Sequence, residues 1–155
     1  MLEEAEQQKR IRIEEARREE ENFEPYSTFH WDKYSDYKGK SYLEAPTDFK
    51  PQYGKCYIPE KNTQTWTTSQ KAGFQVARFF PKSGHFILTG TAEGKVLLFD
   101  VIKNRSLAHT YVGHTKAVRD VCYSNDGRHF LSAAFDGVVR YWDTEYGKGI
   151  FSFII

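Results

Sequence analysis

Three residues in the second half of the chain have the side-chain types of a hydrolase triad. Ser132 supplies a hydroxyl, His114 an imidazole and Asp136 a carboxylate. A serine nucleophile of this kind normally lies on a sharp strand-to-helix turn of the G-x-S-x-G type. Leu131 and Ala133 flank the serine instead, as expected of a buried strand. We therefore predict that the chain is not an enzyme, and we keep the hydrolase as a disfavoured alternative that a serine-directed phosphonate probe would reveal.

The same three side chains, together with Trp142, can form a continuous chain of hydrogen bonds. An indole donates, a serine hydroxyl and a neutral imidazole both donate and accept, and an ionised carboxylate accepts. A chain that runs from the indole through the hydroxyl and the imidazole to the carboxylate satisfies every polar group when all four are buried. If the fold brings His114, Ser132, Asp136 and Trp142 together, they can form such a structural tetrad.

Other strings that look like functional sites fail on their spacing. Residues 90–95 (GTAEGK) resemble a phosphate-binding loop, but they are one residue short and lead into a strand pattern instead of a helix. His85, His109 and His129 show no metal-ligand spacing, and the two cysteines form no CxxC pair. We predict no metal site, no cofactor and no small-molecule substrate.

The elements that must position the tetrad repeat along the chain. Residues 69–100 and 113–143 align with a period of about 43 residues. Each unit contains short β-branched or aromatic runs separated by turn pairs such as Asp126-Gly127 and Asp136-Gly137, which are strong hairpin signals. The pattern predicts two antiparallel meanders of four strands each. We expect strands at 74–80, 86–90, 95–99, 106–111, 117–123, 129–133, 138–142 and 149–153.

The second unit resembles the WD-repeat family, whose four-stranded blades are arranged radially as a β-propeller. The resemblance rests on Gly113-His114 and Trp142-Asp143, which bracket a unit of the right length. In that family the Gly-His histidine, a strand Ser or Thr, the turn Asp and the strand Trp form a buried hydrogen-bond chain. The resemblance therefore implies that His114, Ser132, Asp136 and Trp142 form a buried structural tetrad here. The resemblance implies an all-β fold, a propeller fragment of two four-stranded antiparallel blades in residues 67–155.

The first unit departs from the family pattern. Ser69-Gln70 stands where Gly-His is expected, Glu93 replaces the turn Asp, and Phe99 replaces the Trp, while Thr89 keeps its place. We expect this blade to be held by packing. Because two stacked blades leave two sheet faces open, we also expect them to be the first part of a longer propeller.

Two segments of different composition precede the blades. Residues 1–22 hold eight Glu, five Lys or Arg and no Gly, Pro or aromatic residue, and they predict a helix. Two interpretations stay open for it: a helix that docks in a larger assembly, or a solvated charged tail that frays. Residues 23–66 hold eleven aromatic residues and four of the five prolines, which predicts an extended, irregular segment lying on a protein surface. The residues of this segment that we expect to bind partners are Tyr34, Tyr37, Tyr42 and Tyr57.

The charge balance and the hydropathy pattern disfavour two kinds of partner. With 22 Lys and Arg against 21 Asp and Glu, the net charge is +1, and the strong positive field of a nucleic-acid-binding protein is missing. The lysines of residues 23–66 are nearly balanced by carboxylates, which argues against direct binding of single-stranded RNA there. Since the sequence has no long apolar run and no signal-peptide pattern, we expect a soluble, intracellular chain with no membrane partner.

A closer resemblance, to a spliceosomal family of WD-repeat proteins, rests on three strings. They are DYKGKSYLEAP at 36–46, KCYIP at 55–59 and YVGHTKAVRDVCYSNDGRHFLSAAFDGVVRYWDTEYG at 111–147. The first string matters most, because a tyrosine-rich lead-in is not part of the generic WD pattern. The resemblance implies a nuclear, non-enzymatic scaffold that supports the second transesterification step of pre-mRNA splicing. It implies spliceosomal proteins as partners, with small nuclear RNA or pre-mRNA within the complex.

The blade residues by themselves leave another function open. Propellers serve many unrelated systems, so a WD-repeat adaptor in another complex, such as a substrate receptor for ubiquitin ligation, is the alternative. The two hypotheses differ in what should co-purify with the chain: small nuclear RNAs for a splicing subunit, and cullin-type proteins for the adaptor.

Overall fold

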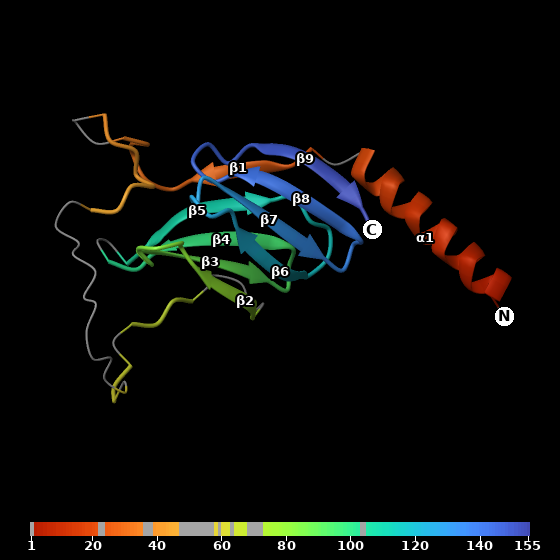
Figure 1. Cartoon of the computed structure of the whole chain (residues 1–155), viewed down its shortest axis with the longest axis horizontal. Helices are drawn as coiled ribbons and strands as arrows, with labels where there is room; N and C mark the ends of the chain where they lie inside the picture. The colour runs from red at the N-terminus through yellow and green to blue at the C-terminus, as the bar shows by residue number, and fades with distance from the viewer. Residues whose placement is uncertain are drawn as a thin grey trace.

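A computed structural model describes most of the chain. Within the described residues, one helix precedes nine strands, which form two antiparallel sheets lying side by side (Figure 1). The elements are α1 (Leu2–Glu21), β1 (Tyr26–Phe29), β2 (Phe74–Phe79), β3 (Phe86–Thr91), β4 (Lys95–Asp100), β5 (Leu107–Val112), β6 (Val118–Tyr123), β7 (His129–Ala134), β8 (Val138–Asp143) and β9 (Gly149–Ile154). The described residues are 2–21, 24–35, 39–46, 58, 60–62, 64–67, 73–102 and 105–155.

The two predicted meanders are observed. The first blade is β2–β5 and the second blade is β6–β9, each with consecutive strands as neighbours. The observed strand ends differ from the predicted ones by no more than one residue. The hairpins turn where the sequence places glycine, with φ of 73° at Gly127 and 81° at Gly137. Glycine adopts this left-handed region without the steric cost that a Cβ brings, which is why Asp-Gly marks these turns so well.

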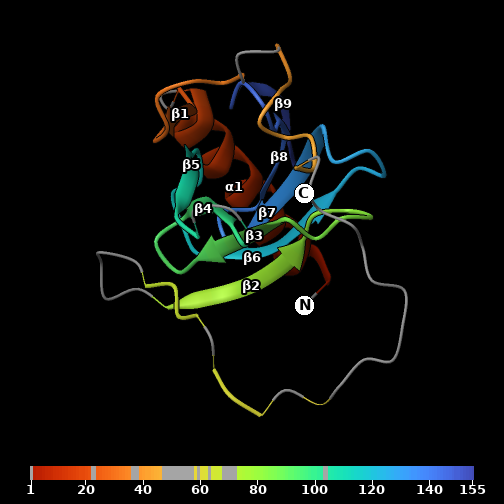
Figure 2. The ribbon, with the colours of Figure 1, turned by 90° about the vertical axis from the view of Figure 1, so that its left-hand side faces the viewer.

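The first blade has one strand more than the four that the repeat predicts. β1 lies in the segment that we expected to be irregular, and it pairs antiparallel with the outer strand β5, with Tyr26 opposite Val112 and Phe29 opposite His109. Figure 2 shows β1 beside β5 at the outer edge of this blade. Four residues that follow a proline carry too little periodicity to be recognised as a strand. β1 forms because β5 offers an edge of unpaired backbone groups, which only the folded blade provides.

The core lies where the two blades face each other. β6 packs against β2 and β3, and the closest approach is at Gly90, where an added Cβ would lie 2.6 Å from Cγ1 of Val118. At this point the backbone of the first blade contacts a side chain of the second blade. A residue larger than glycine at position 90 would push the two blades apart. The side chains at this interface that are at most 1% exposed include Phe86, Leu88, Val96, Leu98, Tyr111, Val118, Val121, Phe130 and Trp142.

The predicted charged helix is observed as α1, which projects from the end of the blades near β9 (Figure 1). Its side chains are largely exposed, including Ile11 at 52%, and Glu14 and Arg18 form an exposed ion pair one turn apart. Such a pair contributes only about 0.3–0.5 kcal/mol, so little within the helix itself stabilises it. No helix in the part of the chain that the structure describes is long and apolar enough to cross a membrane.

Substitutions at two turn glycines test whether the two blades are in contact at the turn that contains Gly127. In Gly127→Ala the new Cβ would overlap the Phe80 ring of the first blade, and the residue would also adopt a strained φ. The matched control is Gly39→Ala, which has a similar φ of 75° and nothing within 4 Å of the added Cβ. We expect the control to lower the free energy of unfolding by about 1–2 kcal/mol and Gly127→Ala by about 1–3 kcal/mol more, measured by urea denaturation. Equal losses would mean that the two blades do not meet at this turn.

Candidate functional site

The structure brings the four residues of the predicted tetrad together inside the second blade. Trp142 Nε1 donates to Ser132 Oγ at 2.9 Å, and Ser132 Oγ lies 2.7 Å from His114 Nε2. The other imidazole nitrogen, Nδ1, lies 2.9 Å from Oδ2 of Asp136. Each of the four residues is at most 8% exposed. The tetrad therefore connects the loop before β6, the middle of β7, the β7–β8 turn and the end of β8.

The chemistry of the groups sets the direction of these bonds. Because the indole can only donate, the Ser132 hydroxyl gives its proton to His114 Nε2, and the imidazole donates from Nδ1 to Asp136. The carboxylate also accepts from the backbone amides of Thr115 at 3.1 Å and Val138 at 3.0 Å. Burial would raise the pKa of Asp136, but the hydrogen bonds from His114 and from the two backbone amides together hold this pKa below its ordinary value. Asp136 is therefore ionised at neutral pH, and the series of hydrogen bonds in the tetrad ends on a carboxylate that accepts three hydrogen bonds.

Burial decides what the tetrad can do. Ser132 is 0% exposed, and its oxygen already takes part in both bonds, so a substrate has no route to it. The loop that carries His114 passes against the indole so closely that a Cβ at Gly113 would lie 2.7 Å from Cζ2 of Trp142. The first residue of the Gly-His pair is therefore a glycine, because the backbone at this position must pass close to the indole ring of Trp142. This arrangement joins turns to strands and has no accessible nucleophile.

The first blade lacks a tetrad in the part that the structure describes. Thr89 bonds the Leu97 carbonyl of its own sheet at 3.3 Å, and Glu93 forms an ion pair with Lys95 at 3.3 Å. Phe99, at the position equivalent to the indole, is 4% exposed and contacts Trp66, with 6.2 Å between ring centroids. Ser69-Gln70, the string in place of Gly-His, falls outside the described residues. Packing replaces hydrogen bonds at this position.

A second cluster fastens the segment before the blades to them. We call residues 24–46 the lead-in, and its rings Phe29, Trp31, Tyr34 and Tyr42 the aromatic clamp. Phe29 lies at the centre of the clamp: its ring stacks on Tyr34 with 4.1 Å between centroids and lies 5.0 Å from Tyr42. The clamp packs against Phe86, which lies 5.9 Å from Tyr42, and against β5. The sequence predicted that the aromatic residues of this segment lie on a protein surface. For these four rings, that surface belongs to the chain's own blades.

The Tyr42 hydroxyl extends this attachment to the second blade. It donates to the backbone carbonyls of Thr144 at 2.8 Å and Glu145 at 3.1 Å, in the loop after β8. Tyr111 of the first blade donates to the same Thr144 carbonyl at 2.7 Å. Burial, followed by the charge of Glu145, raises the pKa of Tyr42, so the phenol stays a neutral donor. The lead-in and the first blade together hold one loop of the second blade.

Two buried histidines complete the attachment. His85 is 2% exposed, and its Nε2 donates to the Leu43 carbonyl of the lead-in at 3.0 Å while Nδ1 accepts from Ser83 Oγ at 2.6 Å. His109 is 0% exposed, and its ring stacks on Tyr111 with 4.5 Å between ring centroids. Its Nδ1 atom lies 3.3 Å from the hydroxyl oxygen of Tyr42. Within the described residues its Nε2 has no hydrogen-bond partner. Both histidines act in the neutral form.

Burial explains why these imidazoles stay uncharged. It lowers the pKa of His85, and it lowers the pKa of His109 to about 4, with a smaller contribution from the neighbouring His30. Sequence reasoning set both residues aside because an isolated histidine in a strand or turn has no motif. The signal that singles them out is their burial against the lead-in, which depends on the tertiary structure.

The structure places the four tyrosines predicted to bind partners in different settings. Tyr34 is 41% exposed, so part of its ring remains accessible beside the clamp. The Tyr42 hydroxyl is engaged within the chain, as described above. Tyr37 and Tyr57 lie outside the described residues. Tyr26 on β1, which sequence reasoning did not select, is 57% exposed. Among the described residues, no group of three His, Cys, Asp or Glu side chains could hold a metal ion.

Comparison with known proteins defines the class of this fold. Residues 105–143, which contain the whole tetrad, match the family model "WD domain, G-beta repeat". The crystal structure of the β-propeller domain of Myceliophteria thermophila Cps50 (Swd1) is similar with a TM-score of 0.57 and 28% identity, over 63% of this chain and 29% of that chain. The chain therefore carries a WD repeat, and its two sheets are blades of a β-propeller fragment.

The closer resemblance predicted from the sequence is confirmed as a similarity to pre-mRNA-processing factor 17. The chain is 38% identical to pre-mRNA-processing factor 17 of Homo sapiens, over 87% of this chain and 24% of that protein. It is 30% identical to pre-mRNA-processing factor 17 of Saccharomyces cerevisiae, over 81% of this chain and 29% of that protein. The chain thus spans about a quarter of the length of the curated relatives that it matches.

The tetrad makes a sharp prediction about Ser132. Ser132→Ala leaves the indole N–H and one imidazole nitrogen buried without a partner, so we expect the free energy of unfolding to fall by about 2–3 kcal/mol. Ser152→Ala is the matched control on exposed β9 and should change it by no more than about 0.5 kcal/mol. Trp142→Ala, which also removes a large core side chain, should cost about 3–5 kcal/mol. Urea denaturation measures all three, and a Ser132→Ala variant as stable as its control would contradict the tetrad.

The neutral state of His109 predicts a pH dependence of stability. Between its ordinary pKa of 6.5 and the native value of about 4, the unfolded chain binds a proton that the native chain does not. Stability should therefore be full above pH 6.5 and fall as the pH drops toward 4, by at most about 1.4 kcal/mol per pH unit from this residue. His109→Phe keeps a ring against Tyr111 and should flatten the slope, although His85 still contributes. Identical slopes for the variant and the parent chain would show that His109 is not the group responsible.

Proposed function

We propose that this chain acts in the nucleus as a non-enzymatic WD-repeat scaffold of the spliceosome and supports the second transesterification step of pre-mRNA splicing. The observation that carries the proposal is the extent of the similarity. β2–β9 and their loops occupy only residues 74–155, so a match over 87% of the chain includes much of the sequence before β2. Because the blades alone are shared by proteins of many functions, the part of this match that lies before β2 is what supports a splicing role.

The structure supports a scaffold through what it leaves available. The tetrad is buried and the aromatic clamp is occupied within the chain, so strand edges, blade rims and the exposed side of the lead-in are the surfaces that remain for partners. Tyr34 lies on that exposed side. We propose it as a contact for spliceosomal proteins, and we keep Tyr37 and Tyr57 as proposed contacts from the sequence. In a spliceosome, such surfaces would hold partners in place while RNA and metal ions perform the chemistry.

A WD-repeat adaptor in another complex, such as a substrate receptor for ubiquitin ligation, is the second candidate. The observation that favours it is the similarity of the blades to the Cps50 (Swd1) propeller, which shows that this fold is not confined to splicing proteins. That similarity covers less of the chain than the similarity to the two splicing relatives does.

Affinity purification of the tagged chain from cells distinguishes the two candidates. A splicing scaffold should enrich small nuclear RNAs and spliceosomal proteins, while an adaptor should bring down cullin-type proteins without those RNAs. The variant Phe29→Ala removes the ring at the centre of the aromatic clamp and should reduce the recovered RNA. Tyr26→Ala removes an exposed ring of the same lead-in and serves as the matched control. Cullin-type partners without small nuclear RNA would refute the spliceosomal role.

The finer proposal concerns the step of splicing. Antibody depletion of the protein from a splicing extract should leave the first transesterification intact and block the second. The cleaved upstream exon and the lariat intermediate should then accumulate, and ligated exons should be lost. A block before the first cleavage would contradict the assignment to the second step while leaving a splicing role in place.

A further inference from the structure

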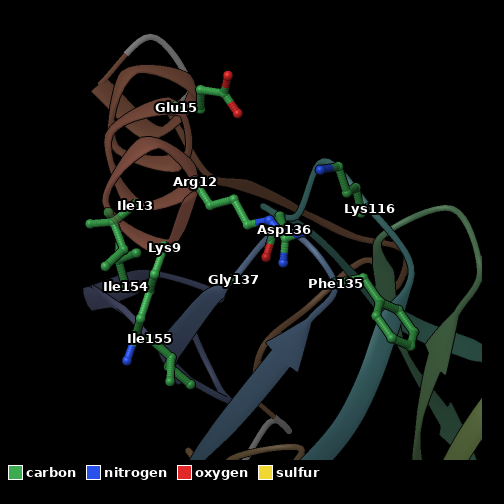
Figure 3. A pocket seen from close by; sticks show the side chains of 10 residues that line it. All are labelled: Lys9, Arg12, Ile13, Glu15, Lys116, Phe135, Asp136, Gly137, Ile154 and Ile155. Carbon is green, nitrogen blue, oxygen red and sulfur yellow. The ribbon is translucent and has the colours of Figure 1, made fainter. Parts of the chain in front are cut away.

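A groove lies between α1 and the second blade, apart from the tetrad and the aromatic clamp (Figure 3). Its volume is about 550 Å³. Lys9, Arg12 and Ile13 line it from the helix, Lys116 from the loop before β6, and Phe135 from the β7–β8 turn. Because the walls come from distant parts of the chain, the groove exists only when α1 lies beside the second blade.

Positive charge dominates the accessible side chains of this groove. Arg12 extends from the helix toward Asp136, and Lys116 lies on the side away from the helix (Figure 3). In the described part of the chain, Lys9, Arg12 and Lys116 have no carboxylate partner at ion-pair distance. Asp136 also lines the groove, but its oxygens already accept bonds from His114 and two backbone amides. Three cationic side chains thus line the groove, and the buried carboxylate that lines it with them, Asp136, already has hydrogen-bond partners.

Apolar side chains lie next to these cations. Ile13 is 38% exposed and Phe135 is 63% exposed, and the guanidinium of Arg119 lies 6.0 Å from the centre of the Phe135 ring. A cation over an aromatic face holds the ring in place at an exposed site. An exposed aromatic ring rimmed by basic side chains is typical of a surface that binds another protein.

We propose that this groove binds an acidic segment of a partner protein, with its carboxylates facing Lys9, Arg12 and Lys116 and an apolar side chain on Phe135. The inference rests on this chain's own residues and does not depend on the spliceosomal role. It also gives α1 a function, because a docked segment would hold the helix against the second blade. The docking-helix interpretation of residues 1–22 is thereby preferred to the frayed tail.

A nucleic-acid strand fits the same groove less well. Residues 1–22 hold eight Glu against five Lys or Arg, and Glu15 stands at the groove itself. A strand with one phosphate per nucleotide would be repelled along most of this helix, whereas a short acidic peptide places its charge only where the cations lie. Phe135 and Ile13 favour aliphatic or aromatic side chains of a peptide.

The test uses a fluorescein-labelled peptide of about twelve residues that alternates Glu or Asp with Leu and Phe, titrated with the whole chain and followed by fluorescence anisotropy. The variant Arg12→Gln/Lys116→Gln should weaken binding about tenfold, and Phe135→Ser should weaken it several-fold. The matched control is Arg10→Gln/Lys148→Gln, which removes one exposed charge from α1 and one from the second blade outside the groove. The control should stay within about twofold of the parent chain. All altered residues are exposed, and equal urea midpoints check that the variants fold alike.

Three results would overturn the proposal. Equal weakening in the groove variant and the control would show that binding follows total charge and not this groove. Tighter binding of an oligouridylate of equal charge, lost in the same groove variant, would make the groove a nucleic-acid site. Absence of peptide binding at millimolar concentration would mean that the groove does not dock an acidic segment.

Discussion

The constraint on which this structure depends is that each blade must bury a sheet face against its neighbour. A four-stranded meander has two faces and cannot cover either one by itself, so the core of the chain lies between the blades and not within one of them. The close approach at Gly90 and Val118 and the buried indole of Trp142 are consequences of this contact. The outward sides of the pair remain apolar and exposed, at Phe79 on β2 and Phe151 on β9.

Within that constraint, the two blades are held by different means. The second blade uses the tetrad, in which an indole at the blade interface is oriented by a hydroxyl, an imidazole and a carboxylate that no substrate can reach. The first blade places Phe99 at the same position and relies on contact with other rings. A hydrogen-bonded network fixes orientation as well as burial, because each polar group left unpaired is costly. Packing alone fixes burial, which is why the first unit tolerates so many departures from the pattern.

The lead-in adds a second connection between the blades. β1 extends the first blade by one strand, the aromatic clamp covers the outer part of its core, and Tyr42 continues to the loop after β8. Segments that precede a repeat are often regarded as linkers, yet here the lead-in contributes hydrogen bonds to both blades. A relative that shared only the blades would lack these contacts.

The sequence by itself determined the blades and their strands, because these depend on local signals such as alternating apolar residues and Asp-Gly turns that recur with the repeat. The membership of the tetrad came from the resemblance of the second unit to the WD-repeat family. The sequence did not reveal β1, the internal role of Tyr42 or the burial of His85 and His109. Those features depend on which edge, carbonyl or ring the folded blades present to a segment far away in the chain, and a short strand or an isolated histidine carries no periodic signal of its own. Tertiary structure decided them because their partners lie many residues away: His109 is opposite Phe29, and Tyr42 bonds Thr144.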